Sequence, residues 1–201
     1  MEEIRGSSGV VRFAGEVKVW PPSVDAARPA RCYKCGRSAY DGSRVRLHGN
    51  GLVSRQGRGP SAPDAEATGR NLLCRTYECQ ECGAVMRVVP PDFTSRKHFT
   101  GAAIAMAFAL WGLCGKTAAE VRGRVNDWKH TGPSARGWAS LERWARQAAR
   151  GGLFGWLALR ATGPPQVVAR DAAQALCGWA PPDRRPDPLD HQAFAGACHV
   201  S

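Results

Sequence analysis

The chain has 201 residues, 43% of them hydrophobic, which is enough for one ordinary domain or two small ones and excludes a large enzyme fold. Its 28 Lys and Arg outnumber its 17 Asp and Glu, and the resulting net charge of +11 suggests a polyanionic partner such as nucleic acid. An arginine-rich composition inherited from a GC-rich genome would give the same excess. Only clustering of the positive charge would therefore favour such a partner.

Residues 1–14 contain two adjacent acids and no apolar stretch of the length that a secretion signal requires. We therefore expect a cytoplasmic protein, in which disulfides are disfavoured and eight cysteines point to metal binding or thiol chemistry. The uncharged run 99–115 is short for a bilayer span and rich in alanine and glycine. A buried helix explains this run better than a membrane span, so we expect no membrane partner.

The first half of the chain favours short strands separated by turn residues. Residues 57–69, rich in Gly, Pro, Ser and Ala, are predicted to form a mobile loop. Pro90 and Pro91 should end the last strand of this half. The predicted strands cover 17–20, 45–53 with a hairpin turn at Gly49-Asn50-Gly51, 72–77 and 84–89.

From residue 94 onward the apolar period changes from two to about 3.6, which predicts helices. Thr117, with Glu120 three residues later, forms a capping box, and Gly115 is expected to end the preceding helix. A Pro-rich linker over 181–188 precedes a short terminal segment. The predicted helices cover 100–113, 117–125, 134–149 and, with weaker patterns, 153–161 and 166–177.

The predicted fold class is α+β, with three consecutive parts. Residues 1–93 should form a small β zinc ribbon that includes the mobile loop. Residues 94–150 should form an all-α helix-turn-helix domain, and 151–201 a helical C-terminal tail.

Two Cys-x-x-Cys-Gly sequences carry the strongest signal in the chain: Cys32 and Cys35 before Gly36, and Cys79 and Cys82 before Gly83. This spacing lets two thiolates converge on one tetrahedral ion, while the glycine permits the tight turn behind them. Two such pairs bind one structural Zn²⁺ completely and leave no coordination position for a substrate or an activated water. We expect one zinc ion, which stabilises the fold and takes part in no reaction.

Three alternatives concern residues near these pairs. Cys74 stands five positions before Cys79 in a predicted strand, an odd separation that places it on the opposite face. His48 could replace a cysteine ligand, but a lone histidine beside a turn is more often exposed or packed. A thioredoxin-like redox function needs a single Cys-x-x-Cys that opens a helix in a βαβ unit, and neither pair has that setting.

Three consecutive short helices predict a compact helix-turn-helix, whose third helix, 134–149, would lie in the major groove of DNA. At about 100° per residue, Trp138, Leu141 and Trp144 share one apolar side of this helix. The opposite side is polar and has no acid, with Glu142 near the boundary, so it suits contacts to guanine edges and phosphates. The residues assigned to this side are Arg136, Ser140, Arg143, Arg146, Gln147 and Arg150. Phosphate contacts from the second helix are expected from Lys116, Arg122 and Arg124.

Several segments resemble a known group of proteins. They are Cys32-x-x-Cys35, Leu47-His48-Gly49, Tyr77-x-Cys79-x-x-Cys82 and Val88-x-Pro90-Pro91-x-Phe93. Their order resembles the amino-terminal zinc-ribbon region of bacterial insertion-sequence transposases and of related stand-alone zinc-ribbon/helix-turn-helix proteins. The stretch from Gly137 to Trp144 is similar to the recognition helix of those proteins. The resemblance covers about residues 32–150 and implies recognition of element ends or a similar DNA site. The RNase H-like domain of a full transposase, with its acidic triad, has no counterpart here.

Together these observations favour a sequence-specific protein that binds double-stranded DNA without catalysing a reaction, as a transposase-related accessory protein or regulator of a mobile element. A homodimer formed through 151–201 is a second partner compatible with the sequence. An RNA- or protein-binding zinc-ribbon adaptor is one alternative, and a transposase or nuclease is another. The latter needs carboxylates that converge on paired metal ions. The candidate acids Asp171, Asp183, Asp187 and Asp190 instead lie on a predicted helix and a Pro-rich linker.

Overall fold

The structure is a computed structural model of the whole chain and describes residues 9–13, 19–93, 97–128, 137–159 and 161–199. The fold is mixed α+β, as the sequence predicts. The chain divides into two compact units, one of Met1–Gly57 with Asn71–His98 and one of Arg58–Arg70 with Phe99–Ser201. The predicted boundary at residue 150 does not separate units, because helices on both sides of it share one hydrophobic core.

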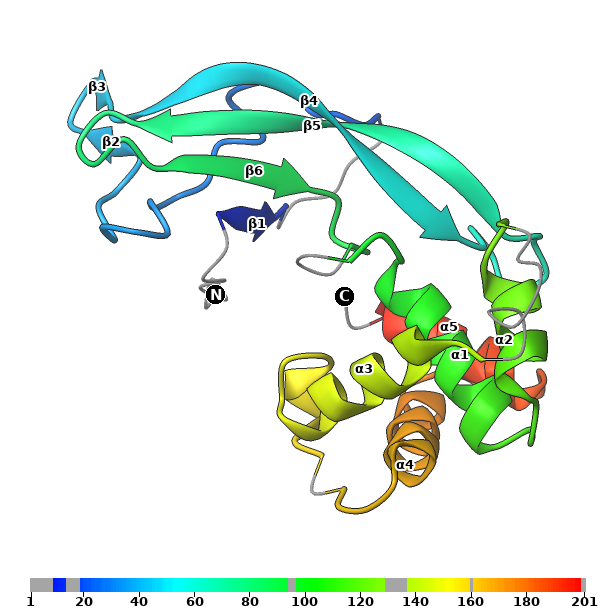
Figure 1. Cartoon of the computed structure of the whole chain (residues 1–201). Coiled ribbons are helices and arrows are strands. Elements are labelled where there is room, and N and C mark those ends of the chain that lie inside the picture. Colours follow the sequence, from blue (N-terminus) through cyan, green and yellow to red (C-terminus); the bar gives the residue numbers. More distant parts are fainter. Residues whose placement is uncertain (1–8, 14–18, 94–96, 129–136, 160, 200–201) are drawn as a thin grey trace. The chain divides into compact units, whose positions relative to one another are not determined.

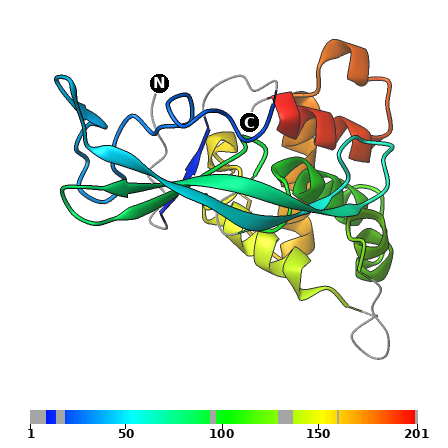
Figure 2. The same cartoon turned by 90° about the horizontal axis from the view of Figure 1, so that it is seen from above.

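A four-stranded sheet with the strand order β1-β6-β5-β4 dominates the first half of the chain (Figure 1). β1 pairs parallel to β6, and β5 pairs antiparallel to β6. The two longest strands, β4 and β5, coil about one another as neighbouring strands of a twisted sheet do (Figure 2). The strand bounds are Val10–Arg12 for β1, Tyr40–Asp41 for β2, Arg44–Val45 for β3, Leu47–Gly59 for β4, Thr68–Cys79 for β5 and Val85–Val89 for β6. β2 and β3 form a separate two-stranded sheet.

The predicted hairpin over 45–53 is wrong, because β4 continues without a break through the expected Gly49–Gly51 turn. Gly51 has a φ of +86°, which glycine tolerates inside a strand as well as in a turn. The hydroxyl of Thr76 on β5 donates a hydrogen bond to the carbonyl oxygen of Asn50 at 2.7 Å. Pairing with a partner strand of 12 residues therefore overrides the local turn signal.

The segment predicted to be a mobile loop, 57–69, is the closed end of the β4–β5 hairpin. β4 extends to Gly59 and β5 begins at Thr68, so strands occupy both ends of the segment. Arg124 of α2 (Ala118–Val125) donates hydrogen bonds to the carbonyl oxygens of Pro63 and Ala65, the latter at 2.7 Å. These bonds hold the end of the hairpin against α2.

The predicted strand over 17–20 lies partly outside the described residues. Val19 and Trp20 form a bend and belong to no strand. The indole Nε1 of Trp20 donates a hydrogen bond to the carbonyl oxygen of Leu73 at 2.8 Å, and its ring packs edge-on against Phe13. The segment is therefore held by side-chain contacts.

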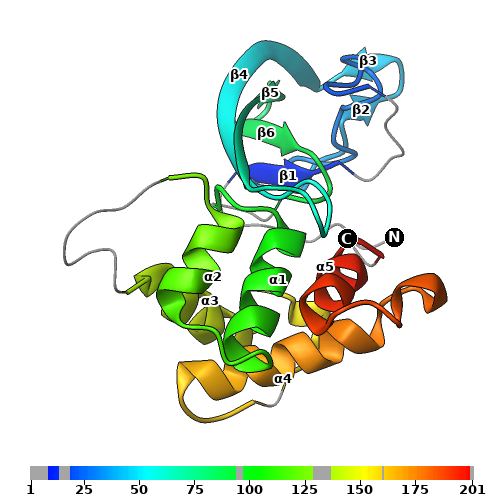
Figure 3. The same cartoon turned by 90° about the vertical axis from the view of Figure 1, so that its right-hand side faces the viewer.

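The described residues of the second unit form five α-helices, with α1 enclosed by the others (Figure 3). Every residue of α1 from Gly101 to Leu110 is buried, which confirms the expected buried helix. No helix in the described part of the chain has both the length and the apolarity needed to cross a bilayer. Besides α2, the helix bounds are Gly101–Gly112 for α1, Ala139–Ala149 for α3, Pro165–Gly178 for α4 and Leu189–His199 for α5.

The local helix signals agree with the structure at α2 and at α4, where the helix predicted over 166–177 forms as Pro165–Gly178. The capping box is present, because Thr117 Oγ1 accepts from the Glu120 amide and Glu120 Oε2 accepts from the Thr117 amide. The helix predicted over 153–161 is wrong, since only a three-residue 3-10 turn, Gly155–Leu157, forms there. The predicted start of the third helix, 134–136, lies outside the described residues.

The predicted helix-turn-helix is not confirmed. The segment between α2 and α3 includes 129–136, which lie outside the described residues. The described residues therefore do not contain the turn of about three or four residues that joins the helices of a helix-turn-helix. Both helices instead pack against α1 as parts of a larger helical unit.

Two glycines show how tightly α4 and α5, the expected tail, join this unit. A Cβ atom at Gly112 of α1 would lie 2.5 Å from the main-chain nitrogen of Arg170 in α4. A Cβ at Gly196 of α5 would lie 1.9 Å from the carbonyl oxygen of Leu176 in α4. Only glycine allows these helix backbones to approach so closely.

Gly196→Ala should lower the free energy of unfolding by about 1–3 kcal/mol, because α4 and α5 must move apart to make room for the methyl group. Chemical denaturation followed by circular dichroism measures this change. Gly123→Ala is the matched control, since no atom lies within 4 Å of its added Cβ on α2. The control should be neutral or stabilising by up to about 1 kcal/mol. Equal stability of both variants would contradict the observed α4–α5 packing.

Candidate metal centre

The two cysteine pairs have the same backbone structure. In the first pair the amide of Gly36 donates to the carbonyl oxygen of Cys32 at 2.9 Å, and in the second the amide of Gly83 donates to that of Cys79 at 2.8 Å. Both glycines have φ near +70°, at +71° and +66°, in the left-handed region that turns the chain back. Each Cys-x-x-Cys-Gly sequence thus builds one tight turn that directs both thiols to the same side.

The four thiols converge on one point. The sulfur atoms of Cys32 and Cys82 are 3.7 Å apart, those of Cys35 and Cys79 are 3.8 Å apart, and all four lie within 4.8 Å of one another. A disulfide requires about 2.05 Å between sulfurs, so these distances exclude two bonded pairs. A tetrahedral ion with metal–sulfur bonds of about 2.3 Å separates its sulfurs by about 3.8 Å. The geometry therefore fits a single structural metal site, and the predicted ligands Cys32, Cys35, Cys79 and Cys82 meet.

The two cysteines of the first pair, Cys32 and Cys35, differ in their surroundings. Burial raises the pKa of the Cys32 thiol to about 12, whereas the main-chain amide of Arg37 lowers the pKa of Cys35 to about 7. Cys32 and Cys79 are buried in the core of the sheet unit, beside Leu47 and Met86. A bound cation supplies the positive charge that keeps buried thiols deprotonated. A buried thiolate without such a cation would be costly.

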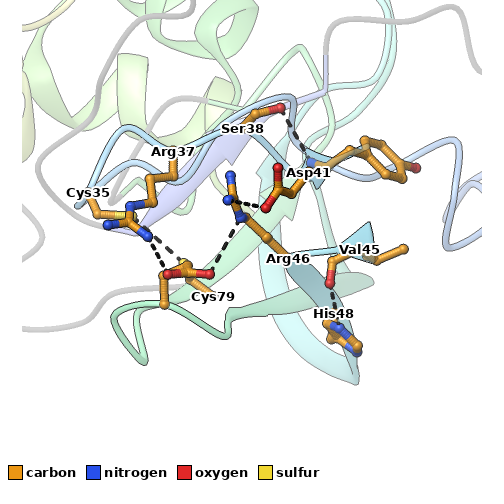
Figure 4. A network of polar contacts seen from close by, with 10 residues as sticks. Cys35, Arg37, Ser38, Asp41, Val45, Arg46, His48 and Cys79 are labelled. Atoms are coloured by element: carbon orange, nitrogen blue, oxygen red, sulfur yellow. Dashed lines mark hydrogen bonds and ion pairs between the residues drawn. The ribbon is translucent and has the colours of Figure 1, made fainter. Parts of the chain in front are cut away.

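A carboxylate links the two cysteine turns. Glu81 stands between Cys79 and Cys82 and accepts a hydrogen bond from Arg37, which follows the first pair. Its carboxylate also forms an ion pair with Arg46, whose Nε lies 3.4 Å from Oε1 (Figure 4). Arg46 also pairs with Asp41. Sequence reasoning missed this network, because 44 positions separate Arg37 from Glu81 and no local pattern joins them.

The other residues weighed as ligands lie elsewhere. Cys74 is fully buried in a different cluster, with Val89 and Phe93, which confirms its predicted separation from the cysteine site. His48 is exposed, and its Nε2 lies 2.9 Å from the carbonyl oxygen of Val45 (Figure 4). Among the described residues, the four cysteines are the one group of three or more metal-ligating side chains that lie together.

The residues predicted to contact DNA have different environments. Arg143, Arg146 and Arg150 are exposed on α3 and just after it. Lys116 is exposed, with its Nζ 3.5 Å from the Glu120 carboxylate. Ser140 is half-buried and accepts from Arg143 Nη2 at 3.1 Å.

The remaining candidates from this set face inward or lie outside the described residues. Arg122 is 7% exposed and donates to the carbonyl oxygen of Gly137 at 2.9 Å. Arg124 binds the hairpin end, and the Gln147 side-chain oxygen is buried. The structure therefore does not favour Arg122 and Arg124 as phosphate contacts, because their donors are used inside the protein. Arg136 lies outside the described residues.

Comparison with known proteins adds no assignment, since no family model, no curated protein and no solved structure matches the chain.

Cys35→Ser should weaken metal binding more than tenfold, a loss of at least about 1.4 kcal/mol, because a serine hydroxyl is a poor substitute for a thiolate ligand. Cys35 is the suitable ligand to change because it is exposed, so the variant disturbs little packing. Competition with a chromogenic chelator measures the affinity. Cys114→Ser, at an exposed cysteine of the helical unit, should leave the affinity unchanged. Equal loss in both variants would contradict the site.

Arg122→Ala should reduce the free energy of unfolding by about 1–3 kcal/mol, because a buried side chain is lost together with its hydrogen bond to the Gly137 carbonyl. Arg143→Ala, at an exposed arginine of the same unit, should change it by about 0.5 kcal/mol or less. Thermal denaturation of the two variants separates these roles. A stable Arg122→Ala protein would show that the Arg122–Gly137 hydrogen bond does not support the fold.

Proposed function

We propose that the chain is a double-stranded DNA-binding protein, stabilised by one zinc ion, with the exposed arginines of α3 as its main DNA contact. The distribution of charge carries this proposal. From Trp128 to Arg170 the sequence has seven Lys and Arg and a single acid, Glu142. At the chain's average composition, these 43 residues would hold about six Lys and Arg and about four acids, so the segment is cationic because acids are scarce in it. A segment with charges of nearly one sign suits a polyanion.

The shape of α3 supports a groove contact. Leu141, Trp144 and Ala148 are buried on one side of the helix. Arg143, Arg146 and Arg150 follow one another at helical spacing on the exposed side and span about 10 Å of helix axis. That length is comparable to the roughly 12 Å width of the major groove, so all three guanidinium groups can reach the same groove.

Glu142 does not remove this positive character. Its carboxylate lies 2.7 Å from Arg146 Nη2, and both side chains are more than half exposed, at 53% and 55%. Solvent-exposed ion pairs contribute little free energy, so Arg146 can exchange its carboxylate partner for a phosphate. The pair is therefore compatible with DNA binding.

Four thiolates in tetrahedral geometry favour zinc over the hard ions Mg²⁺ and Ca²⁺, which prefer oxygen ligands. A site closed by four protein ligands leaves no position for a substrate, so we assign it a structural role and no reaction. The resemblance to transposase zinc-ribbon regions extends the proposal to an accessory protein or regulator of a mobile element.

The double variant Arg143→Ala/Arg146→Ala should bind a DNA duplex at least tenfold more weakly than the wild type. The slope of log affinity against log salt concentration should fall by about 2, because two phosphate contacts are lost. Fluorescence anisotropy with a labelled duplex over a salt series measures both quantities.

Arg184→Ala/Arg185→Ala is the matched control, since it removes the same charge from exposed positions of the same unit. It should leave the affinity and its salt dependence nearly unchanged. Equal losses in the two double variants would reject α3 as the contact. Binding of RNA or a protein in place of duplex DNA would favour the adaptor alternative.

A further inference from the structure

A stacked arginine and tryptophan form an exposed aromatic platform in the helical unit. The guanidinium carbon of Arg58 lies 3.6 Å from the ring centroid of Trp128 and covers one face of the indole. Trp128 nevertheless remains 52% exposed, so much of its ring is accessible to solvent. Burying this ring against a partner would recover the free energy that its exposure costs.

The hairpin end that carries Arg58 is held in place. The amide of Thr100 donates to the carbonyl oxygen of Arg58 at 3.4 Å. Gly59, the next residue, has a φ of +113°, and a Cβ there would lie 2.5 Å from that of Ala103, so the strand lies directly on α1. The Arg124 bonds to Pro63 and Ala65 fix the far side of the same hairpin end. Arg58 is thus presented to Trp128 by a docked segment.

The segment that carries Trp128 also makes close contacts. Asp127, which precedes Trp128, lies against the hairpin, since a Cβ at Gly69 would be 2.6 Å from its Oδ2. Asn126 is 7% exposed and marks the point where the chain leaves α2. The indole thus follows closely on the buried end of α2, and the side chain of its neighbour Asp127 lies against the hairpin, so a ligand would lose little entropy in ordering this surface.

The surroundings of Trp128 narrow the class of ligand. A cationic ligand is disfavoured, because the Arg58 guanidinium already occupies one face of the ring and repels a second cation. An apolar protein segment needs a contiguous apolar surface, whereas the charged Arg58 guanidinium covers one face of this ring. A nucleotide combines a neutral planar ring, which stacks on indole, with a phosphate, which a guanidinium attracts.

We propose that Trp128 and Arg58 bind an unpaired nucleotide of DNA, with its base stacked on the indole. The nucleotide must be unpaired, because both faces of a base inside a duplex are covered by its neighbours. This inference rests on the proposed DNA-binding function and adds to it a preference for duplexes that carry a single-stranded end. α3 supplies the salt-dependent contact, and Trp128 supplies a stacking contact that depends little on salt.

The test compares two labelled duplexes that differ only in their overhang. One carries a short oligo-dA overhang and the other an abasic overhang with the same number of phosphates. The wild type should bind the dA overhang about 5- to 160-fold more tightly, the range expected for stacking of one base on an aromatic side chain. Anisotropy titrations at two salt concentrations measure this ratio, which should persist at the higher one.

Trp128→Ala should reduce the ratio to near one, and Trp128→Phe should retain a large part of it because phenylalanine still stacks. Trp179→Ala is the matched control, because it removes another exposed tryptophan, 50% accessible, of the same unit. It should keep the wild-type ratio. An unchanged ratio in Trp128→Ala, or no preference in the wild type, would overturn the inference.

A blunt duplex separates this inference from the proposed function. Binding of the blunt duplex should depend on Arg143 and Arg146 and not on Trp128. If the blunt duplex is not bound but the dA overhang is bound through Trp128, duplex recognition by α3 fails and the stacking site stands. If the blunt duplex is bound and Trp128→Ala changes no ratio, the stacking site fails and the proposed function stands.

Discussion

Four thiols that converge from sequence positions up to 50 apart are the constraint on which the sheet unit depends. Thiolates at these distances repel one another, so a bound cation is the natural source of the attraction that holds them. The metal would join two turns that no disulfide links and that otherwise share the Glu81 ion pairs and a small core. In a unit of this size, a bound metal would supply much of the free energy of folding.

Features set by adjacent residues could be predicted from the sequence. The two cysteine turns form because Gly36 and Gly83 permit the same left-handed bend, and the α2 capping box forms because Thr117 and Glu120 bond to each other's amides. Features set by distant partners could not. The turn signal at Gly49–Gly51 yields to the long pairing of β4 with β5, a contact that a local pattern does not contain.

The arginines illustrate the same limit within the candidate DNA-binding region. Helical periodicity separates the buried side of α3 from its exposed arginines, because that side packs within its own unit. In the sequence, Arg122 and Arg124 look like the arginines of α3, yet in the structure they donate to the carbonyl oxygens of Gly137 and of the hairpin end. Positive charge thus serves two purposes in this unit, internal bonding at α2 and exposure at α3, and only the packing distinguishes them. Packing also decides the place of the expected tail. Its helices α4 and α5 belong to the core because Gly112 and Gly196 allow the helix backbones to approach closely.

X-ray absorption spectroscopy at the zinc edge of the purified, metal-loaded protein tests the account most directly. The four-cysteine centre predicts one zinc per chain with a first shell of four sulfurs at about 2.3 Å and no lighter ligand. A first shell that contains nitrogen or oxygen, or a protein that folds fully without any stoichiometric metal, would contradict the claim that these thiols hold a structural ion.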